Sequence, residues 1–140
     1  MKILVIDGQG GRMGRAIVEQ LRTACPEISL IAIGTNSIAT AAMMKAGADA
    51  GATGENPVLV NSRDADLIIG PIGIVIADSM LGEITPAMAT AIGSSPAHKI
   101  LIPAGNYRYC RHTLIGCSDQ PMGAYIRQAA EEVVARVRKA

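Results

Sequence analysis

The sequence predicts an α/β protein in which an open, mostly parallel sheet lies between two layers of helices. The chain opens with an apolar, β-branched run at residues 3–6, which enters a glycine-rich turn and leaves it in a helical pattern. Apolar runs and helical patterns then alternate, which is typical of parallel strands joined by helices. Hydrophobic residues make up 49% of the chain, yet Phe and Trp are absent. The core must therefore be aliphatic, as in a sheet covered on both faces.

The predicted strands and helices follow from these patterns. The strands are expected over residues 2–7, 28–33, 49–53, 66–70 and 100–103. The helices are expected over residues 11–24, 37–46, 57–63, 72–81, 87–92 and 121–137. Asn36 or Ser37 is expected to cap the second helix, and Thr85 with Pro86 to start the fifth. This order predicts the three-layer αβα arrangement of a Rossmann-like fold.

Two parts of the chain require a choice between alternatives. Residues 57–60 resemble a strand, but only about six residues would separate them from the strand at 66–70, too few for a parallel crossover. We therefore predict a helix there, capped by Asn56 and with Pro57 as its first residue. Residues 113–117 follow a polar and aromatic connection, and we expect them to pair antiparallel at one edge of the sheet.

Composition limits the compartment and the partners. With a net charge of +1 and no polybasic run, nothing favours binding to nucleic acid or to an anionic membrane. The first apolar stretch is too short for a signal peptide or a transmembrane span. The three cysteines, Cys25, Cys110 and Cys117, are irregularly spaced, which suits reduced thiols in a cytoplasmic protein. We expect residues 1–140 to form one domain.

Glycine-containing loops follow four of the predicted strands. The carboxyl ends of parallel strands share one edge of the sheet, and ligands of such folds bind in the crevice beyond that edge. Glycines also let a phosphate group approach backbone N–H groups at a helix start. The expected ligand-binding residues are Gly8, Gln9, Gly10, Gly11, Arg12, Met13, Gly34, Thr35, Asn36, Thr53, Gly54, Glu55, Asn56, Gly70, Pro71 and Gly73. The alternative is that each loop only forms turns and helix caps.

The spacing of the first loop bears on the cofactor. It fits Gly8-x-x-Gly11-x-x-Gly14 rather than the G-x-G-x-x-G pattern of dinucleotide-binding proteins. The second strand ends in Gly34-Thr35-Asn36, without the acid that holds the ribose of NAD or a nearby Arg for the extra phosphate of NADP. We therefore expect a mononucleotide, a small phosphorylated metabolite, or NADP held by neutral hydroxyl and amide groups.

Two acids are candidates for catalysis: Asp7 beside the first loop and Glu55 in the third. Either could serve as a general base or bind a metal ion. Asp7 could equally accept hydrogen bonds from loop N–H groups. The spacing of Cys110-x-His112 and Cys117 matches no ordinary zinc site, so we predict no metal. The segment 107–109 could stack on a base or form an exposed hairpin.

Two resemblances rest on these motifs. Gly8-x-x-Gly11-Arg12-Met13-Gly14 resembles the N-terminal loop of dihydrodipicolinate reductase, an NAD(P)H enzyme, over residues 1–20. That family's histidine-rich catalytic segment and substrate domain are absent, so the resemblance does not imply its activity. Over nearly its whole length, the chain is similar to an uncharacterised bacterial family of short Rossmann-like proteins, through residues 6–11, 51–56 and 70–73. This second resemblance implies a fold and no established reaction.

The sequence thus supports three hypotheses: a protein that binds a nucleotide or phosphorylated metabolite, a small enzyme that uses Asp7 or Glu55, and a structural or regulatory homodimer without a ligand. The predicted helix at 72–81 bears on assembly because it is apolar on most of its circumference. Covering a sheet needs an apolar stripe of only about 100°. Unless the helix at 87–92 folds over it, we predict a homodimer in which this helix packs against its symmetry mate.

Overall fold

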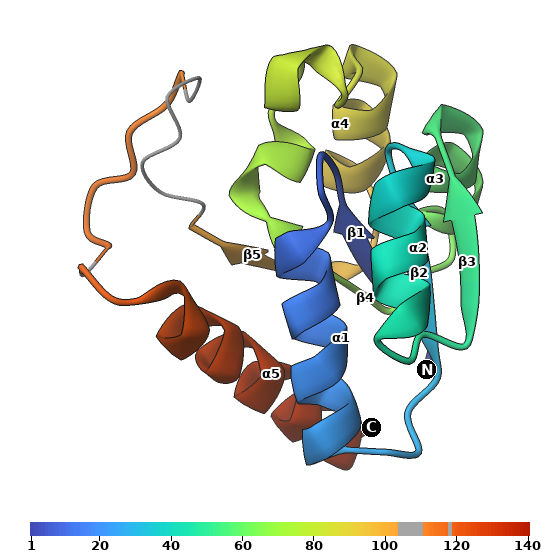
Figure 1. The fold of residues 1–140 in the computed structure, drawn as a ribbon, viewed down its shortest axis with the longest axis vertical. Helices are drawn as coiled ribbons and strands as arrows, with labels where there is room; N and C mark the ends of the chain where they lie inside the picture. The colour runs from blue at the N-terminus through green and yellow to red at the C-terminus, as the bar shows by residue number, and fades with distance from the viewer. Residues whose placement is uncertain (104–110, 118) are drawn as a thin grey trace.

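A five-stranded parallel sheet forms the centre of the molecule (Figure 1). The computed structural model describes residues 1–103, 111–117 and 119–140. The strands are β1 (Ile3–Asp7), β2 (Leu30–Gly34), β3 (Ala50–Thr53), β4 (Leu67–Pro71) and β5 (His98–Ile102). Their order across the sheet is β3-β2-β1-β4-β5, and every pair is parallel. The predicted α/β class and parallel sheet are therefore confirmed, and the direction of strand addition reverses between β1 and β4.

Helices cover both faces of this sheet (Figure 1). The helices are α1 (Arg12–Ala24), α2 (Ser37–Lys45), α3 (Glu55–Asn61), α4 (Pro86–Gly93) and α5 (Met122–Lys139). Ile3 and Val5 of β1 pack in one buried cluster with α1 and α5. Leu4 and Ile6 point the other way, into a cluster with residues of α3 and α4. This alternation follows from the two-residue period of a strand and explains why β1 is apolar without a polar face.

The helix predicted over residues 72–81 is wrong. This segment contains two short 3-10 turns, η1 (Ile72–Val75) and η2 (Met80–Gly82), separated by irregular chain. Ile74 and Ile84 are both fully buried in the cluster beneath α4. Residues ten apart would stand about 15 Å apart along a continuous helix. A bent segment instead brings both side chains into the same core.

The homodimer prediction loses its basis with that helix. Part of the apolar surface that suggested a symmetry mate is covered within the subunit, since Ile74 is 0% exposed and Val75 packs against the same cluster. Leu81 is the large apolar side chain of this segment that remains strongly exposed, at 71%.

The predicted antiparallel edge strand is also wrong. Residues 113–117 form no strand, and β5 occupies that edge of the sheet. Leu114 and Ile115, neighbours in the chain, are both exposed, so the segment has no buried face that would fix a register. The preceding prediction, on residues 107–109 and Cys110, falls on residues outside the described ones.

Helix starts divide into confirmed and corrected predictions. Asn36 caps α2 by accepting a hydrogen bond from the Ala39 N–H at 2.9 Å, and Thr85 caps α4 in the same way through Met88. Asn56 is not a cap, because α3 already begins at Glu55 after Gly54, whose φ of 103° is left-handed. Among the described residues, no helix combines the length and apolar character needed to cross a membrane.

Candidate functional site

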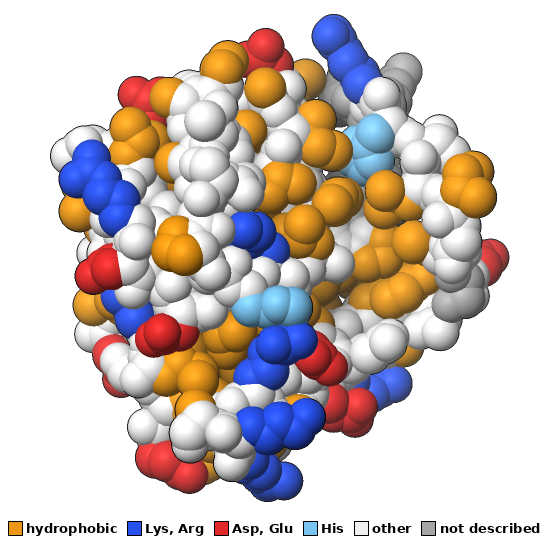
Figure 2. Space-filling model, turned by 180° about the vertical axis from the view of Figure 1, so that it is seen from behind, with side chains coloured by type: hydrophobic (Ala, Val, Ile, Leu, Met, Phe, Trp, Pro, Cys, Tyr) orange, Lys and Arg blue, Asp and Glu red, His pale blue; other side chains and the backbone are white. Residues whose placement is uncertain are grey.

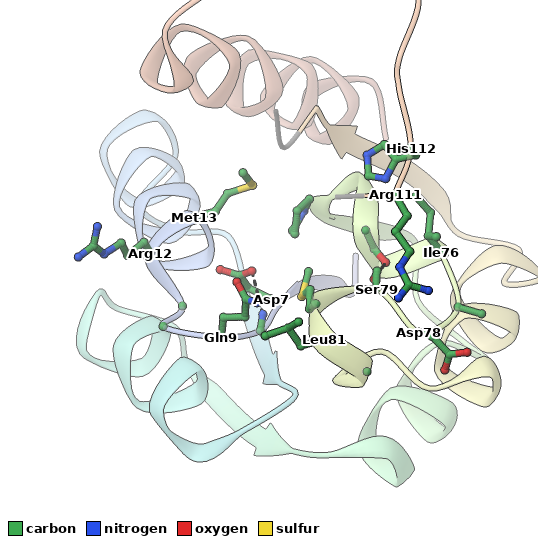
Figure 3. Close-up of a pocket in the computed structure, with 18 residues that line it drawn as sticks. Asp7, Gln9, Arg12, Met13, Ile76, Asp78, Ser79, Leu81, Arg111 and His112 are labelled. Carbon is green, nitrogen blue, oxygen red and sulfur yellow. Dashed lines mark hydrogen bonds between the residues drawn. The ribbon is translucent and has the colours of Figure 1, made fainter. Parts of the chain in front are cut away.

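A pocket of about 890 Å³ lies at the carboxyl ends of β1 and β4, where the strand order reverses (Figure 3). This is the position at which open α/β sheets bind ligands, and the volume falls in the range of small-molecule sites. Its walls come from the loop after β1, the end of β4, the bent segment that follows β4, and two residues beyond β5. The lining residues are Asp7 to Met13, Pro71, Gly73, Ile76 to Gly82, Arg111 and His112.

The pocket combines apolar walls with polar groups. Figure 2 shows hydrophobic side chains gathered around a hollow on the back of the molecule, with charged side chains near its margin. In the pocket, Met13 comes from the start of α1, and Ile76, Met80 and Leu81 come from the bent segment after β4. Such walls suit a ligand with a flat or apolar body, and the polar groups must then orient it.

Asp7 organises the glycine loop. Its Oδ1 accepts a hydrogen bond from the Gly8 N–H at 2.8 Å, and its Oδ2 accepts one from the Gly14 N–H at 2.7 Å. The carboxyl is 5% exposed, and burial raises its pKa above the usual value despite these hydrogen bonds. Asp7 thus ties the end of β1 to the first turn of α1. Of the two roles considered for this residue, its contacts are those of a loop acceptor.

Three N–H groups near Asp7 remain available. In the described part of the chain, the backbone N–H groups of Gly10, Arg12 and Met13 have no hydrogen-bond partner. They lie at the start of α1, a helix of thirteen residues, where the positive end of the helix dipole is located. All three residues line the pocket. The arrangement can accept an anionic group without displacing any existing hydrogen bond.

The side chain of Arg12, a residue expected to bind the ligand, points away from the pocket (Figure 3). The nearby Arg15 pairs with Glu19 at 2.8 Å on the exposed face of α1. Arg111, by contrast, lines the pocket beside His112, and its side chain lies next to Ser79 of the bent segment (Figure 3). Sequence reasoning missed both pocket residues. The signal was the rule already applied to the other strands, since β5 also ends at this edge of the sheet.

Glu83 is a further residue that sequence reasoning missed. Its Oε1 accepts three hydrogen bonds: from the Gln9 N–H at 3.0 Å, the Thr35 hydroxyl at 2.7 Å and the Asn36 amide at 2.6 Å. Partial burial acts to raise the pKa of Glu83, but the three hydrogen bonds together hold it below the usual value. This carboxylate links the loops after β1 and β2 to the segment that follows β4.

Several expected ligand-binding residues lie outside the pocket. Thr35 and Asn36 bind Glu83, and the Thr53 hydroxyl lies 2.7 Å from that of Thr40. Glu55 accepts a hydrogen bond from the Thr85 hydroxyl at 2.6 Å. The residues from the expected set that do not line the pocket are Gly34, Thr35, Asn36, Thr53, Gly54, Glu55, Asn56 and Gly70. The loops after β1 and β4 thus supply the pocket, while residues that follow β2 and β3 bind Glu83, α2 and the start of α4.

Backbone strain concentrates at this pocket. Four non-glycine residues in the described part of the chain have positive φ, and all four line it: Gln9, Asp78, Met80 and Leu81. A left-handed conformation is costly for long side chains such as Met and Leu, by about 1–2 kcal/mol each. Such strain persists where surrounding contacts enforce it, and it is commonly found at functional sites.

The fold and the position of the pocket define a Rossmann-like α/β protein. A family model described as "Domain of unknown function (DUF3842)" matches residues 2–138, so the chain belongs to this family. The predicted resemblance to an uncharacterised family is therefore confirmed, and the resemblance to dihydrodipicolinate reductase is not. The search of curated proteins gave no match.

Among solved structures, the chain is similar to a dodecameric FMN-dependent Ubix-like decarboxylase from Escherichia coli O157:H7. The two chains are 16% identical and align with a TM-score of 0.46, over 96% of this chain and 77% of the other.

Proposed function

We propose that this protein binds a small phosphate-bearing ligand, of the size of a mononucleotide, in the pocket between β1 and β4. The observation that carries the proposal is the set of unpartnered N–H groups of Gly10, Arg12 and Met13 inside a pocket of about 890 Å³. Hydrogen bonds from backbone donors to a phosphate oxygen are charge-assisted and thus strong. The cytoplasmic location and the single domain expected from the sequence remain predictions.

The other residues around the pocket support this proposal. Arg111 faces the same space from the opposite side and can neutralise part of the phosphate charge. Met80 and Leu81 offer apolar surface for a base or another flat ring. Asp7 lies beneath the phosphate position, where it serves as a positioning residue because both carboxylate oxygens already hold loop N–H groups.

The two alternative functions receive less support. An enzyme that uses Glu55 as a base would need that carboxylate in the pocket, whereas it binds Thr85 on a neighbouring loop. A homodimer without a ligand was predicted from a helix that is absent. Neither alternative accounts for the free N–H groups.

Thermal unfolding against a panel of ligands tests the proposal. The panel holds AMP, FMN, inorganic phosphate, sugar phosphates, NAD and NADP. A ligand present at about one hundred times its dissociation constant should stabilise the fold by about 2.7 kcal/mol. We expect at least one mononucleotide to do so, and its unphosphorylated nucleoside to bind more weakly. A panel without any stabilising phosphate compound would contradict the proposal.

A matched pair of arginine variants tests the place of the phosphate. Arg111→Gln should weaken binding of the stabilising mononucleotide about tenfold, because a charge-assisted hydrogen bond is worth about 1.5–3 kcal/mol. Arg12→Gln is the control, since that side chain points away from the pocket (Figure 3). Calorimetry that finds equal losses for the two variants would place the phosphate elsewhere.

A further inference from the structure

We infer that Glu83 is a specificity-determining residue that closes the β2 side of the crevice, so that the site accepts mononucleotides and excludes dinucleotides. This inference rests on the proposed function and names the class of ligand within it. It also answers a question that the sequence left open, whether neutral groups at the end of β2 hold NADP.

The first step concerns the donors at the end of β2. In Rossmann-like dinucleotide sites, the ligand crosses the glycine loop and reaches the end of the second strand, where the protein holds the ribose hydroxyls or the extra phosphate. Here Thr35 and Asn36 occupy that place, and both already donate to Glu83, at 2.7 and 2.6 Å. A dinucleotide would have to break these hydrogen bonds before it could form its own.

The second step concerns charge. The Gln9 N–H belongs to the glycine loop, and it donates to the same Glu83 oxygen at 3.0 Å. A second phosphate on this path would meet a carboxylate instead of a free donor. Like charges held close together repel, so Glu83 disfavours the pyrophosphate of a dinucleotide in particular.

The third step concerns space. A Cβ atom placed on Gly8 would come within 2.6 Å of the Thr35 Oγ1, 2.7 Å of the Met80 Sδ and 3.5 Å of the Glu83 Oε1. The seam between the β1 loop, the end of β2 and the bent segment therefore has no room for a methyl group at Gly8. The pocket accordingly has no lining residue from β2 or the loop after it.

The fourth step concerns how firmly Glu83 is held. Its neighbour Ile84 is 0% exposed, and the segment is closed by a hydrogen bond from the Asp78 N–H to the Ile84 carbonyl at 2.7 Å. The N–H groups of Gly82 and Glu83 also donate hydrogen bonds to carbonyls within this segment. Glu83 thus extends from an anchored turn, and moving it aside would disturb the core contact of Ile84.

Two ligand pairs test the inference, AMP against NAD and FMN against FAD, because each dinucleotide contains its mononucleotide. Binding is measured by calorimetry. The wild-type protein should prefer the mononucleotide of the pair it binds by about tenfold or more, the equivalent of about 1.4 kcal/mol. Glu83→Ala should reduce this preference about tenfold by freeing the Gln9, Thr35 and Asn36 donors. Glu83→Gln keeps the acceptor oxygen without the charge. Its preference for the mononucleotide should therefore lie between those of the wild-type protein and Glu83→Ala.

Glu55→Ala is the matched control, because Glu55 is also a carboxylate that links two loops but lies outside the pocket. Its preference should equal that of the wild-type protein. Urea unfolding of each variant checks that the fold is retained, and Glu83→Gln supplies the result if Glu83→Ala does not fold.

The outcomes separate the inference from the proposed function. If the wild-type protein binds a mononucleotide and its dinucleotide equally well, or if neither Glu83 variant changes the preference, the inference is wrong while the proposed function stands. If no mononucleotide binds, the inference is wrong. The proposed function is wrong as well only if no phosphate compound of the panel binds.

Discussion

The two sides of the sheet's carboxyl edge differ although both are built from glycine-containing loops. On the β1–β4 side, the chain diverges at the reversal of strand order and leaves a pocket with free N–H groups. On the β2–β3 side, the Gly54 N–H donates to the Gly34 carbonyl at 2.9 Å, and Thr35 and Asn36 bind Glu83. Loop composition therefore does not distinguish an open loop from one that is already bound, because the difference depends on whether another segment already satisfies its donors.

Neighbouring glycines in the first loop illustrate the same difference. Gly11 has a φ of 71°, and a Cβ atom there would come within 2.7 Å of the Ala39 Cα on α2. Gly10 would place a Cβ atom in open space, with nothing within 4 Å. Gly11 is thus required for packing on the β2 side, whereas Gly10 leaves room for a ligand.

The largest expected effect on stability comes from a substitution that breaks the packing of α2 on Gly11. Gly11→Ala should lower the free energy of unfolding by about 2–5 kcal/mol, from left-handed strain and from a clash with backbone that cannot move aside. Gly10→Ala should change it by no more than about 0.5 kcal/mol. Urea unfolding of the two variants measures the difference, and equal midpoints would show that α2 does not pack on Gly11 as described.

A smaller effect concerns Asp7, which supports the pocket side. Asp7→Asn keeps one acceptor oxygen but turns an amide donor toward the N–H of Gly8 or Gly14, so we expect a loss of about 1–3 kcal/mol. Because the pKa of Asp7 is raised in the folded protein, ionisation costs stability as the pH rises from its ordinary value of 3.8 through the folded value. The difference in the free energy of unfolding between the wild-type protein and Asp7→Asn should therefore narrow as the pH rises over that range. A gap that widens would mean that the loop N–H groups outweigh burial.

The smallest effect concerns Glu83 on the closed side, and its sign is opposite. The pKa of Glu83 is lowered in the folded protein, so its stabilising contribution is present above the ordinary value of 4.5 and is lost as the pH falls through the folded value. Glu83→Gln should cost less than about 1 kcal/mol at pH 7, because solvent screens a carboxylate that is only partly buried. Thermal unfolding between pH 3 and 7 should show that the difference in stability between the wild-type protein and Glu83→Gln becomes smaller as the pH falls. A constant gap would mean that the charge of Glu83 does not matter.

Much of the fold was predictable because its signals are local. Residues 3–6 and 67–70 are apolar without alternation, as expected for strands buried on both faces, and both lie at the centre of the sheet. The argument that a crossover must precede β4 also correctly placed a helix, α3, between β3 and β4. The two errors, a helix at residues 72–81 and a strand at residues 113–117, came from apolar residues alone. The pattern did not show which part of the fold those residues pack against.

The candidate site was predictable only in part, for a related reason. Gly8 to Met13, Pro71 and Gly73 were expected, because they follow strands that end at the crevice. Arg111 and His112 were missed because the strand-end rule was not applied to the chain after β5, which ends at the same edge of the sheet. Residues 34–36 and 53–56 were expected in the site because they contain glycine and follow strands. Neither feature shows whether another residue already binds them.

By itself, the sequence determined the strands, most of the helices and the parallel sheet, since periodicity and caps such as Asn36 and Thr85 depend on neighbours in the chain. Only the tertiary structure decided which loops stay open. Glu83 meets Gln9, Thr35 and Asn36 across 74, 48 and 47 residues of sequence. Ile74 and Ile84 enter one core cluster through a bend that their apolar spacing does not encode. Contacts of this kind form only when separate elements pack together, so the shape of the pocket comes from the fold as a whole.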